Sequence, residues 1–447
     1  MPLPLLFFFL LVLLLNSSNY SCAAKVVTCS YIVPFHRRAH TISITDYGGV
    51  GDGRYINTKA FKEAVYAIQR LRRAGGTLLY VPPGVYLTGP FNLTSNMTLY
   101  LAAGAVIKAT QDSLNWPLIP PLPSYGRGRE RPGGRYMSLI HGDGLQDVVI
   151  TGKNGTIDGQ GGVWWNMWRR RTLKFTRPNL VEFLNSRNII ISNVIFKNSP
   201  FWNIHPVYCS NVVVRFVTIL APHDSPNTDG VDPDSSSNVC IEDSYISTGD
   251  DLVSVKSGWD EYGIAYGRPS VNITVRRVTG SSPFAGIAIG SETSGGVENV
   301  RAEHINLYGI GIGIHIKTNA GRGGYIKNIK VFDVYMEDAR KGIKISGNVG
   351  DHPDGKYNRD ALPVVKGITI KHVRGVKVQQ AGLMQGLRNS PFTYICLSDI
   401  NLGGVTGPSR TPSWQCSDVS GIAYQVSPSP CSQLISRPSG SCPNYSS

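Results

Sequence analysis

Asn188-Ile189-Ile190-Ile191 is a four-residue stretch in which an asparagine precedes three β-branched residues. The same kind of unit returns at intervals along most of the chain. The clearest copies are Asn96-Met97-Thr98-Leu99, Asp147-Val148-Val149-Ile150, Asn211-Val212-Val213-Val214, Asn238-Val239-Cys240-Ile241, Asn272-Ile273-Thr274-Val275 and Asn328-Ile329-Lys330-Val331. A turn residue followed by alternating β-branched residues is typical of a short buried strand.

The spacing of these units predicts a solenoid. From Asn188 to Asn328, counting the shorter copy at Asn299-Val300, they are 23, 27, 34, 27 and 29 residues apart. A drifting period with short strands indicates stacked coils. The units are rich in Ile and Val and lack a helical period, which argues against leucine-rich and helical repeats. We therefore predict an all-β fold, a parallel β-helix with three strands per coil and coils about 4.8 Å apart.

The two ends of the solenoid have their own predicted elements. Residues 58–73 carry apolar side chains on one helical face, and we expect this helix to cover the open N-terminal end of the core. A short strand is predicted before it at Thr41–Tyr47. Past Pro391 the repeat fades into a tail rich in Pro, Ser and Cys.

The first residues indicate export. Leu3–Leu15 is apolar except for Pro4 and is shorter than the roughly 20 residues of a transmembrane helix. It is followed by small residues at Cys22-Ala23-Ala24, so residues 1–24 are predicted to be a secretory signal peptide. We expect residues 25–447 to form one domain that is secreted to the cell exterior or cell wall, monomeric, and without stable membrane association.

Cysteines and glycosylation acceptors agree with an oxidising compartment. Seven cysteines remain after Cys22, so disulfides are expected and at least one cysteine has no partner in the chain. Asn-x-Ser/Thr acceptors stand at Asn92, Asn96, Asn154, Asn272 and Asn444. The cysteine spacing leaves the pairing open, and the absence of a Cys-x-x-Cys motif argues against a zinc site.

Acidic residues concentrate in one part of the chain, from Asp229 to Asp251. Asp250 lies 21 residues after Asp229, about one coil, and Asp251 is adjacent to it, so stacking should bring the three together. Crowded carboxylates push their pKa values apart, and one can hold a proton while its neighbour stays charged. This equipment suits acid/base cleavage of a glycosidic bond. An acidic turn or a calcium loop is the alternative interpretation.

The overall charge points to an acidic partner. The formal net charge is +14, which favours nucleic acid, an anionic membrane surface or an acidic polysaccharide. No basic cluster forms a helical stripe interleaved with aromatic residues, so nucleic acid is not expected. Long insertions at Leu114–Tyr136 and Gly350–Leu362 should form the sides of a binding groove.

Four ordered motifs resemble the polygalacturonases, glycoside hydrolase family 28. They are Ser225–Gly230, Gly249-Asp250-Asp251, Gly286–Ser291 and Ile316-Lys317. The resemblance implies a right-handed parallel β-helix that hydrolyses α-1,4-linked galacturonic acid in pectin, with inversion and with no metal or other cofactor. A polyanionic pectic substrate agrees with the positive net charge.

The resemblance also implies roles for individual residues. Asp250 matches the general acid, and Asp229 and Asp251 match the residues that hold the attacking water. Substrate-binding roles fall to Asn227, Lys256, His315 and Lys317. Ile289–Gly296 and Lys256-Ser257-Gly258 look more like the exo-acting members.

Some positions depart from the family pattern. Ala285 stands where the family has the histidine of Gly-His-Gly, and His315 stands where it has an arginine. Leu252 and Ser281 replace the two cysteines of a family disulfide. These departures leave two alternatives open, a pectin-binding pseudoenzyme and a calcium-dependent pectate lyase on the same fold. Because a free imidazole titrates near pH 6.5, His315 further predicts that substrate affinity rises as pH falls.

Overall fold

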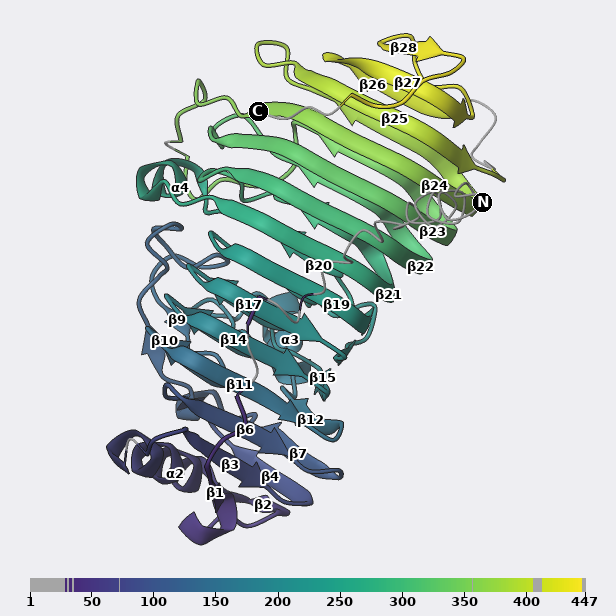
Figure 1. The fold of residues 1–447 in the computed structure, drawn as a ribbon. Coiled ribbons are helices and arrows are strands. Elements are labelled where there is room, and N and C mark those ends of the chain that lie inside the picture. The colour runs from purple at the N-terminus through teal and green to yellow at the C-terminus, as the bar shows by residue number, and fades with distance from the viewer. Residues whose placement is uncertain are drawn as a thin grey trace, which may run out of the picture.

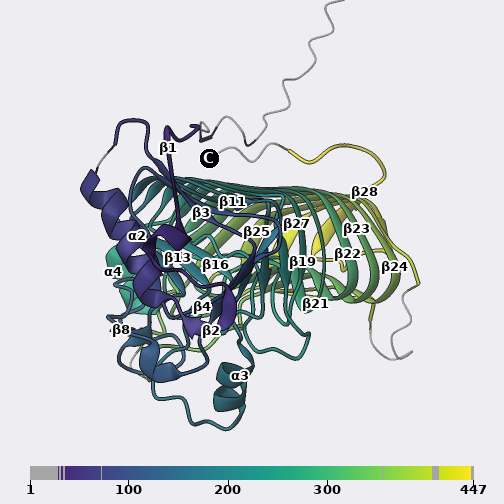
Figure 2. The same cartoon turned by 90° about the horizontal axis from the view of Figure 1, so that it is seen from below.

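The chain winds into an elongated column of stacked coils. The computed structural model describes Cys29 and residues 32–33, 36–71, 73–355, 357–404 and 412–443. The N-terminal coils lie at one end of the column and the C-terminal coils at the other (Figure 1). Viewed from below, the coils superimpose around a common interior (Figure 2). The predicted signal peptide at residues 1–24 and the acceptor Asn444 lie outside the described residues.

Three kinds of strand follow one another around each coil. Strands on the first face carry the repeated units. They are β1 (His40–Ser43), β3 (Thr77–Val81), β6 (Met97–Leu101), β11 (Gln146–Gly152), β14 (Arg187–Ser192), β17 (Ser210–Arg215), β19 (Ser237–Ser247), β21 (Ser270–Ile289), β22 (Val297–Lys317), β23 (Tyr325–Ser346), β24 (Val364–Gln385), β25 (Phe392–Leu402), β27 (Val419–Ser427) and β28 (Leu434–Arg437). Strands β19 and β21 to β25 are longer, with 11 to 22 residues, so that a single strand bends across more than one face.

The other strands complete the coils. Those of the second face are β2 (Asp52–Ile56), β4 (Gly84–Thr88), β7 (Ala105–Ala109), β12 (Gly155–Asp158), β15 (Val194–Lys197) and β18 (Thr218–Leu220). Those of the third face are β5 (Phe91–Asn92), β10 (Ile140–Asp143), β13 (Val181–Leu184), β16 (Ile204–Val207), β20 (Val253–Val255) and β26 (Trp414–Ser417). Among the described strands, only β8 (Leu118–Ile119) and β9 (Arg135–Tyr136) pair antiparallel. The predicted parallel β-helix is confirmed.

Register carries equivalent side chains from coil to coil. The second residue of each repeated unit pairs with its counterpart in the next coil, and all of these side chains are buried. This column contains Val148, Ile189, Val212, Val239, Ile273, Val300, Ile329, Ile368 and Ile395. Because strand side chains alternate between faces, the neighbouring residues point outward. Stacked β-branched side chains thus form the core.

The asparagine of the unit has a backbone role. Asn211, Asn238 and Asn272 have φ of 57°, 55° and 59°, in the left-handed region that asparagine tolerates better than most residues. Each side-chain amide also donates to the asparagine one coil earlier, for example Asn238 Nδ2 to Asn211 Oδ1 at 3.1 Å. The same contact joins Asn211 to Asn188, Asn272 to Asn238, Asn299 to Asn272 and Asn328 to Asn299. The asparagines therefore set the turn and link the coils.

Helix α2 (Thr58–Leu71) covers the N-terminal end of the core, as predicted, although it ends before Arg73. The Phe61 ring stacks on Phe91 of the first coil with a centroid distance of 4.4 Å. The predicted strand at Thr41–Tyr47 is only partly correct. Strand β1 stops at Ser43, and Ile44–Tyr47 is a 3-10 helix because Ser43 and Asp46 form a capping box around it. A second 3-10 helix spans Ser113–Asn115, and helices α3 (Gly162–Arg169) and α4 (Asp260–Tyr266) lie in loops.

The coils continue beyond the point where the sequence pattern fades. Strand β25 pairs with β24, and β27 pairs with β25, in parallel register. The expectation of an irregular tail after Pro391 is therefore too broad. Buried residues such as Ile395 and Ile400 keep the alternation, but the surrounding Pro and Ser residues mask it in the sequence. Disulfides Cys396–Cys442 and Cys416–Cys431 fasten this end.

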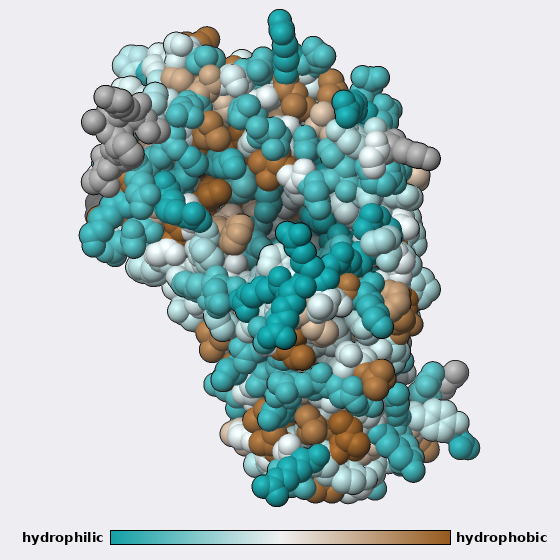
Figure 3. Space-filling model, turned by 180° about the vertical axis from the view of Figure 1, so that it is seen from behind, coloured by the Kyte–Doolittle hydropathy of each residue, from teal (hydrophilic) through white to brown (hydrophobic). Residues whose placement is uncertain are grey.

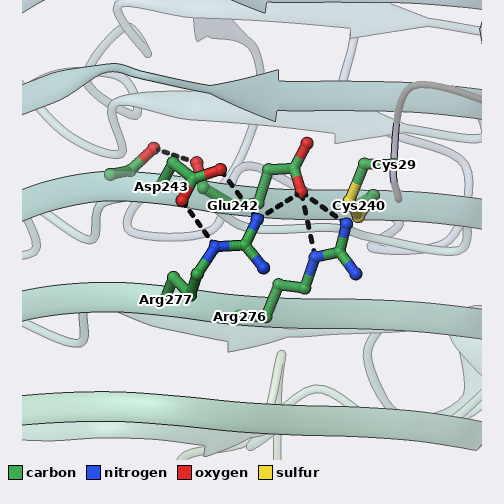
Figure 4. The surroundings of a disulfide bond; sticks show 7 residues. Cys29, Cys240, Glu242, Asp243, Arg276 and Arg277 are labelled. Carbon is green, nitrogen blue, oxygen red and sulfur yellow. Dashed lines mark hydrogen bonds and ion pairs between the residues drawn. A yellow bond between two sulfur atoms is a disulfide. The ribbon is translucent and has the colours of Figure 1, made fainter. Parts of the chain in front are cut away.

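A third disulfide, Cys29–Cys240, fastens the N-terminal segment to the outer surface of β19. Cys29 and Val33 pack there on outward-facing apolar side chains of three strands, Val149, Ile190 and Val213. Beside the disulfide, Arg276 donates to Glu242 at 2.7 Å and Arg277 donates to Asp243 at 2.6 Å (Figure 4). Cys209 is the free cysteine of the described residues and is buried. In the part of the chain that the structure describes, no helix is long and apolar enough to cross a membrane.

Packing of α2 gives a stability prediction. Phe61→Ala should lower the free energy of unfolding by about 3–5 kcal/mol, because the lost ring leaves a cavity at the end of the core. Tyr66→Ala is the matched control, since Tyr66 lies on the same helix and is 59% exposed. It should cost within about 0.5 kcal/mol. Chemical denaturation measures both, and equal costs would contradict the capping role of α2.

Candidate active site

Three aspartates of the predicted site lie together on the third face of the coils. The short strand pairings of this face continue through single bridges, Ile204 with Val231 and Val231 with Val253. Asp229 and Asp251 occupy equivalent places in consecutive coils, since the Gly230 N–H donates to the Asp251 carbonyl at 2.9 Å. Carboxylate oxygens of Asp229, Asp250 and Asp251 lie within 4.8 Å of one another. Stacking thus brings together residues that are about one coil apart in the sequence.

The three carboxyl groups have unlike environments. Burial, followed by the charges of Asp229 and Asp251, raises the pKa of Asp250 well above its usual value. Burial would also raise the pKa of Asp251, but the ammonium groups of Lys317 and Lys256 outweigh it and hold the pKa below its usual value. Burial raises the pKa of Asp229, and Lys256 limits the rise. A proton in this cluster therefore resides preferentially on Asp250, while Asp251 stays ionised.

Two lysines compensate the negative charge. The Lys317 ammonium lies 2.5 Å from Asp251 Oδ2. The Lys256 ammonium lies 3.5 Å from a carboxylate oxygen of each of Asp229, Asp232 and Glu292. Lys256 is only 3% exposed. The sequence resemblance predicts contact with substrate for Lys256, but its position makes it first of all the counter-ion of buried carboxylates.

Asn227 is held in place from behind. Its side-chain oxygen accepts a hydrogen bond from Arg177 Nη2 at 2.9 Å, which leaves the amide nitrogen directed to Asp250 Oδ2 at 3.4 Å. Arg177 is buried and pairs with Glu130 at 2.5 Å. Its guanidinium also lies over the Phe201 ring, 4.9 Å from the centroid. This arrangement orients the Asn227 amide toward the carboxylates.

At the position where the family has a histidine, this chain contacts the carboxylates through its backbone and not through a side chain. Ala285 is fully buried, and its N–H donates to Asp251 Oδ1 at 3.0 Å. A backbone donor therefore fixes the orientation of Asp251 on the side opposite Lys317. Leu252, which stands where the family has a cysteine, is buried in the core.

His315 lies beside the carboxylates but does not titrate as the sequence suggests. Its side chain is 6% exposed, and Nε2 has no hydrogen-bond partner. Burial and then the positive charge of Lys317 lower the pKa of His315 to about 3. The predicted rise of affinity on protonation of His315 would therefore begin only well below the usual pH range of an imidazole, because burial and Lys317 keep the ring neutral.

The carboxylates open onto a cavity of about 360 Å³. Arg129 and Glu130 of the first long insertion and Asp351 of the second line it, together with Trp202 and Trp168. Arg129 joins the two insertions through a contact of 2.8 Å to Asp351, and it also contacts Glu292, which follows β21, at 2.7 Å. Viewed from behind, the surface is hollowed near its middle, and hydrophobic residues are scattered over it (Figure 3).

Sequence reasoning gave no role to Asp232, Glu292 or Arg129. The sequence could have indicated Asp232 as a member of the site. It lies three residues after Asp229, and it follows the buried Val231, so its side chain points outward. Both of its carboxylate oxygens lack a hydrogen bond, and burial raises its pKa well above the usual value. Arg129 and Glu292 are 163 residues apart and leave no local signal.

Comparison with known proteins agrees with this arrangement. Residues 82–431 match the family described as "Glycosyl hydrolases family 28". The chain is 50% identical over 398 residues to "Probable polygalacturonase" of Vitis vinifera. The matched region covers 89% of this chain and 81% of that protein.

Two solved structures are similar along most of their length. The exopolygalacturonase of Thermotoga maritima superimposes with a TM-score of 0.75 at 28% identity, covering 92% of this chain and 96% of that one. The polygalacturonase of Erwinia carotovora ssp. carotovora superimposes with a TM-score of 0.70 at 25% identity, covering 86% and 96%.

The environment of His315 gives a direct test. Its imidazole should remain neutral from about pH 8 to pH 5, because burial and Lys317 disfavour the cation. Nuclear magnetic resonance of ring-labelled histidine follows the titration, and His315→Asn identifies the signal. In denaturant the same ring should titrate near pH 6.5, which serves as the control. A His315 signal that shifts between about pH 5 and 8 in the folded protein would contradict the assignment.

Proposed function

The chain belongs to family 28 of the glycosyl hydrolases, and we propose that it hydrolyses α-1,4-galacturonosyl linkages of pectin by inverting acid/base catalysis. It is a glycoside hydrolase with a pectic substrate. The observation that carries the mechanism is the pKa contrast within the stacked aspartates, where Asp250 is favoured to hold a proton and Asp251 to stay charged.

In this mechanism Asp250 is the acid. Its proton moves to the glycosidic oxygen as the bond to the anomeric carbon breaks. Asp229 and Asp251 hold a water molecule and remove its proton as the oxygen attacks the anomeric carbon. One oxygen from each of the three carboxyl groups lies within 4.8 Å of the others. This is not the spacing of a simple two-carboxylate site, so the distance between the groups does not by itself give the stereochemical outcome.

The lysines keep the base side of the site ionised. Lys317 pairs with Asp251, and Lys256 lies near Asp229. Without these cations, burial would favour the protonated acids. Asn227 contacts Asp250 and faces the cavity, where it can bind substrate hydroxyl groups.

Both alternative functions fit this site less well. A pseudoenzyme would not require three carboxyl groups with opposed pKa shifts. A calcium-dependent lyase would need the carboxylates as metal ligands and a free arginine as base. The Lys317 ammonium already forms an ion pair with the Asp251 carboxylate, and the nearby Arg129 and Arg177 are engaged in ion pairs of their own. The donor set therefore suits a hydrolase better than a calcium site.

We also propose that the protein acts in exo mode, from the end of the substrate chain. Arg129 connects the two long insertions across one side of the cavity, and Arg127 Nη1 donates to the Pro353 carbonyl at 2.5 Å. A groove closed in this way admits a chain end more readily than the middle of a polymer. The similarity to an exopolygalacturonase over 92% of the chain supports this mode.

We also propose that the protein is secreted to the cell wall. Three disulfides within the described residues suit an oxidising compartment. The acceptors Asn92, Asn96, Asn154 and Asn272 are exposed, although the Asn272 amide takes part in the asparagine ladder. A monomeric state remains a prediction.

Asp250→Asn tests the acid. The substitution keeps the shape of the side chain and removes its proton, so turnover of polygalacturonate should fall by about 10²-fold or more. Oligogalacturonide binding should persist, because the asparagine side chain is neutral, like the protonated Asp250, and does not repel a polyanion. Reducing-sugar release and calorimetry measure the two effects.

Asp224→Asn is the control for the chemical change, because the Asp224 side chain is 79% exposed. It should hydrolyse at the parent rate. An Asp250→Asn variant with parent activity would reject the assignment of the acid. If the parent forms an unsaturated product that absorbs in the ultraviolet, and if a chelator abolishes this activity, the result would point to the lyase.

The product profile tests exo action. On a defined oligogalacturonide the parent should release short products from one end, so reducing groups should appear well before the viscosity of polygalacturonate falls. Chromatography of early time points records the products. Early appearance of all intermediate lengths would show endo action and would leave the assignment of Asp250 intact.

A further inference from the structure

Two lysines lie on the coil that follows His315 toward the C-terminus. Ser254, Ala288, His315 and Lys344 are register partners in four consecutive coils and lie at one outward-facing position. Neighbouring coils are about 4.8 Å apart, so Lys344 follows His315 directly. Lys341 lies three residues before Lys344 on the same strand, β23. The surface beyond the carboxylates therefore changes from acidic to basic.

Lys344 has no internal counter-ion. Its side chain is half-buried, and within the described residues no hydrogen bond or ion pair involves it. Its register partners are His315 on one side and the apolar Leu383 on the other. Lys341, also half-buried, is hydrogen-bonded to the neutral side chain of Gln380. Burial and then the charge of Lys317 lower the pKa of Lys344.

The two lysines that line the cavity are already neutralised. Lys317 contacts Asp251 at 2.5 Å, and Lys256 lies among three carboxylates. His315 adds a buried Nε2 without a partner next to Lys344. A half-buried ammonium without a counter-ion is a site to which an anion can bind favourably.

We propose that Lys344, supported by Lys341, binds the carboxylate of a second galacturonate residue, next to the residue that reaches Lys317. The inference rests on the proposed function and makes it more specific. A methyl ester or a neutral sugar at this position would leave the ammonium without a partner. This position should therefore favour an unesterified acidic residue over a methyl-esterified or neutral one.

Lys344→Met tests this site, because it keeps most of the length of the side chain and removes its charge. Affinity for trigalacturonate, measured by calorimetry, should fall about tenfold or more, as expected for one hydrogen bond to a charged group. The KM for polygalacturonate should rise more than kcat falls. The preference for unesterified over methyl-esterified substrate should shrink.

Lys366→Met is the matched control, because Lys366 is exposed and lies at the other end of its long strand, β24. It should bind trigalacturonate as the parent does. Unchanged affinity in Lys344→Met, or equal losses for esterified and unesterified ligands, would overturn the proposal. Because the binding measurement does not depend on turnover, an inactive parent would refute the proposed function without deciding this site.

Discussion

The parallel register between coils is the constraint on which the rest of the structure depends. Each strand pairs with its counterpart in the next coil, so a side chain recurs about 4.8 Å away at an equivalent place. Inward positions can then be filled with stacked β-branched residues, as in the column from Val148 to Ile395. Outward positions inherit the same alignment. The site is therefore a consequence of the stacking, since Asp229 and Asp251 become neighbours because Gly230 and Asp251 share a hydrogen bond.

Stacking places several carboxylates together in a buried site, and nearby lysines offset their negative charge. Burying carboxylates together disfavours their charged forms. Lys317 and Lys256 supply the opposite charge, but each reaches a different part of the cluster. Asp251 is stabilised as an anion, whereas Asp250 is left to take the proton. Unequal compensation by two cations thus shifts the pKa values of chemically similar residues in opposite directions.

The insertions add a second level to the rigid column. Arg129 and Asp351 belong to loops that leave the coils far apart in the sequence, and they meet beside the cavity. Arg177 connects the first insertion, through Glu130, to Asn227. The loops therefore both shape the entrance and hold a residue of the site. Their positions depend on ion pairs and not on the strand pairing that fixes the coils.

The sequence by itself determined the fold and the grouping of the three aspartates, because both depend on local patterns. Repeated asparagines with β-branched residues reveal the coils, and the interval from Asp229 to Asp250 matches one coil. Only the tertiary structure decided the environments of these groups. Burial and Lys317 make His315 neutral, three carboxylates surround Lys256, and Arg129 bridges residues that are distant in the chain. Desolvation and long-range charge contacts depend on the packing of all neighbours, and no local pattern encodes them.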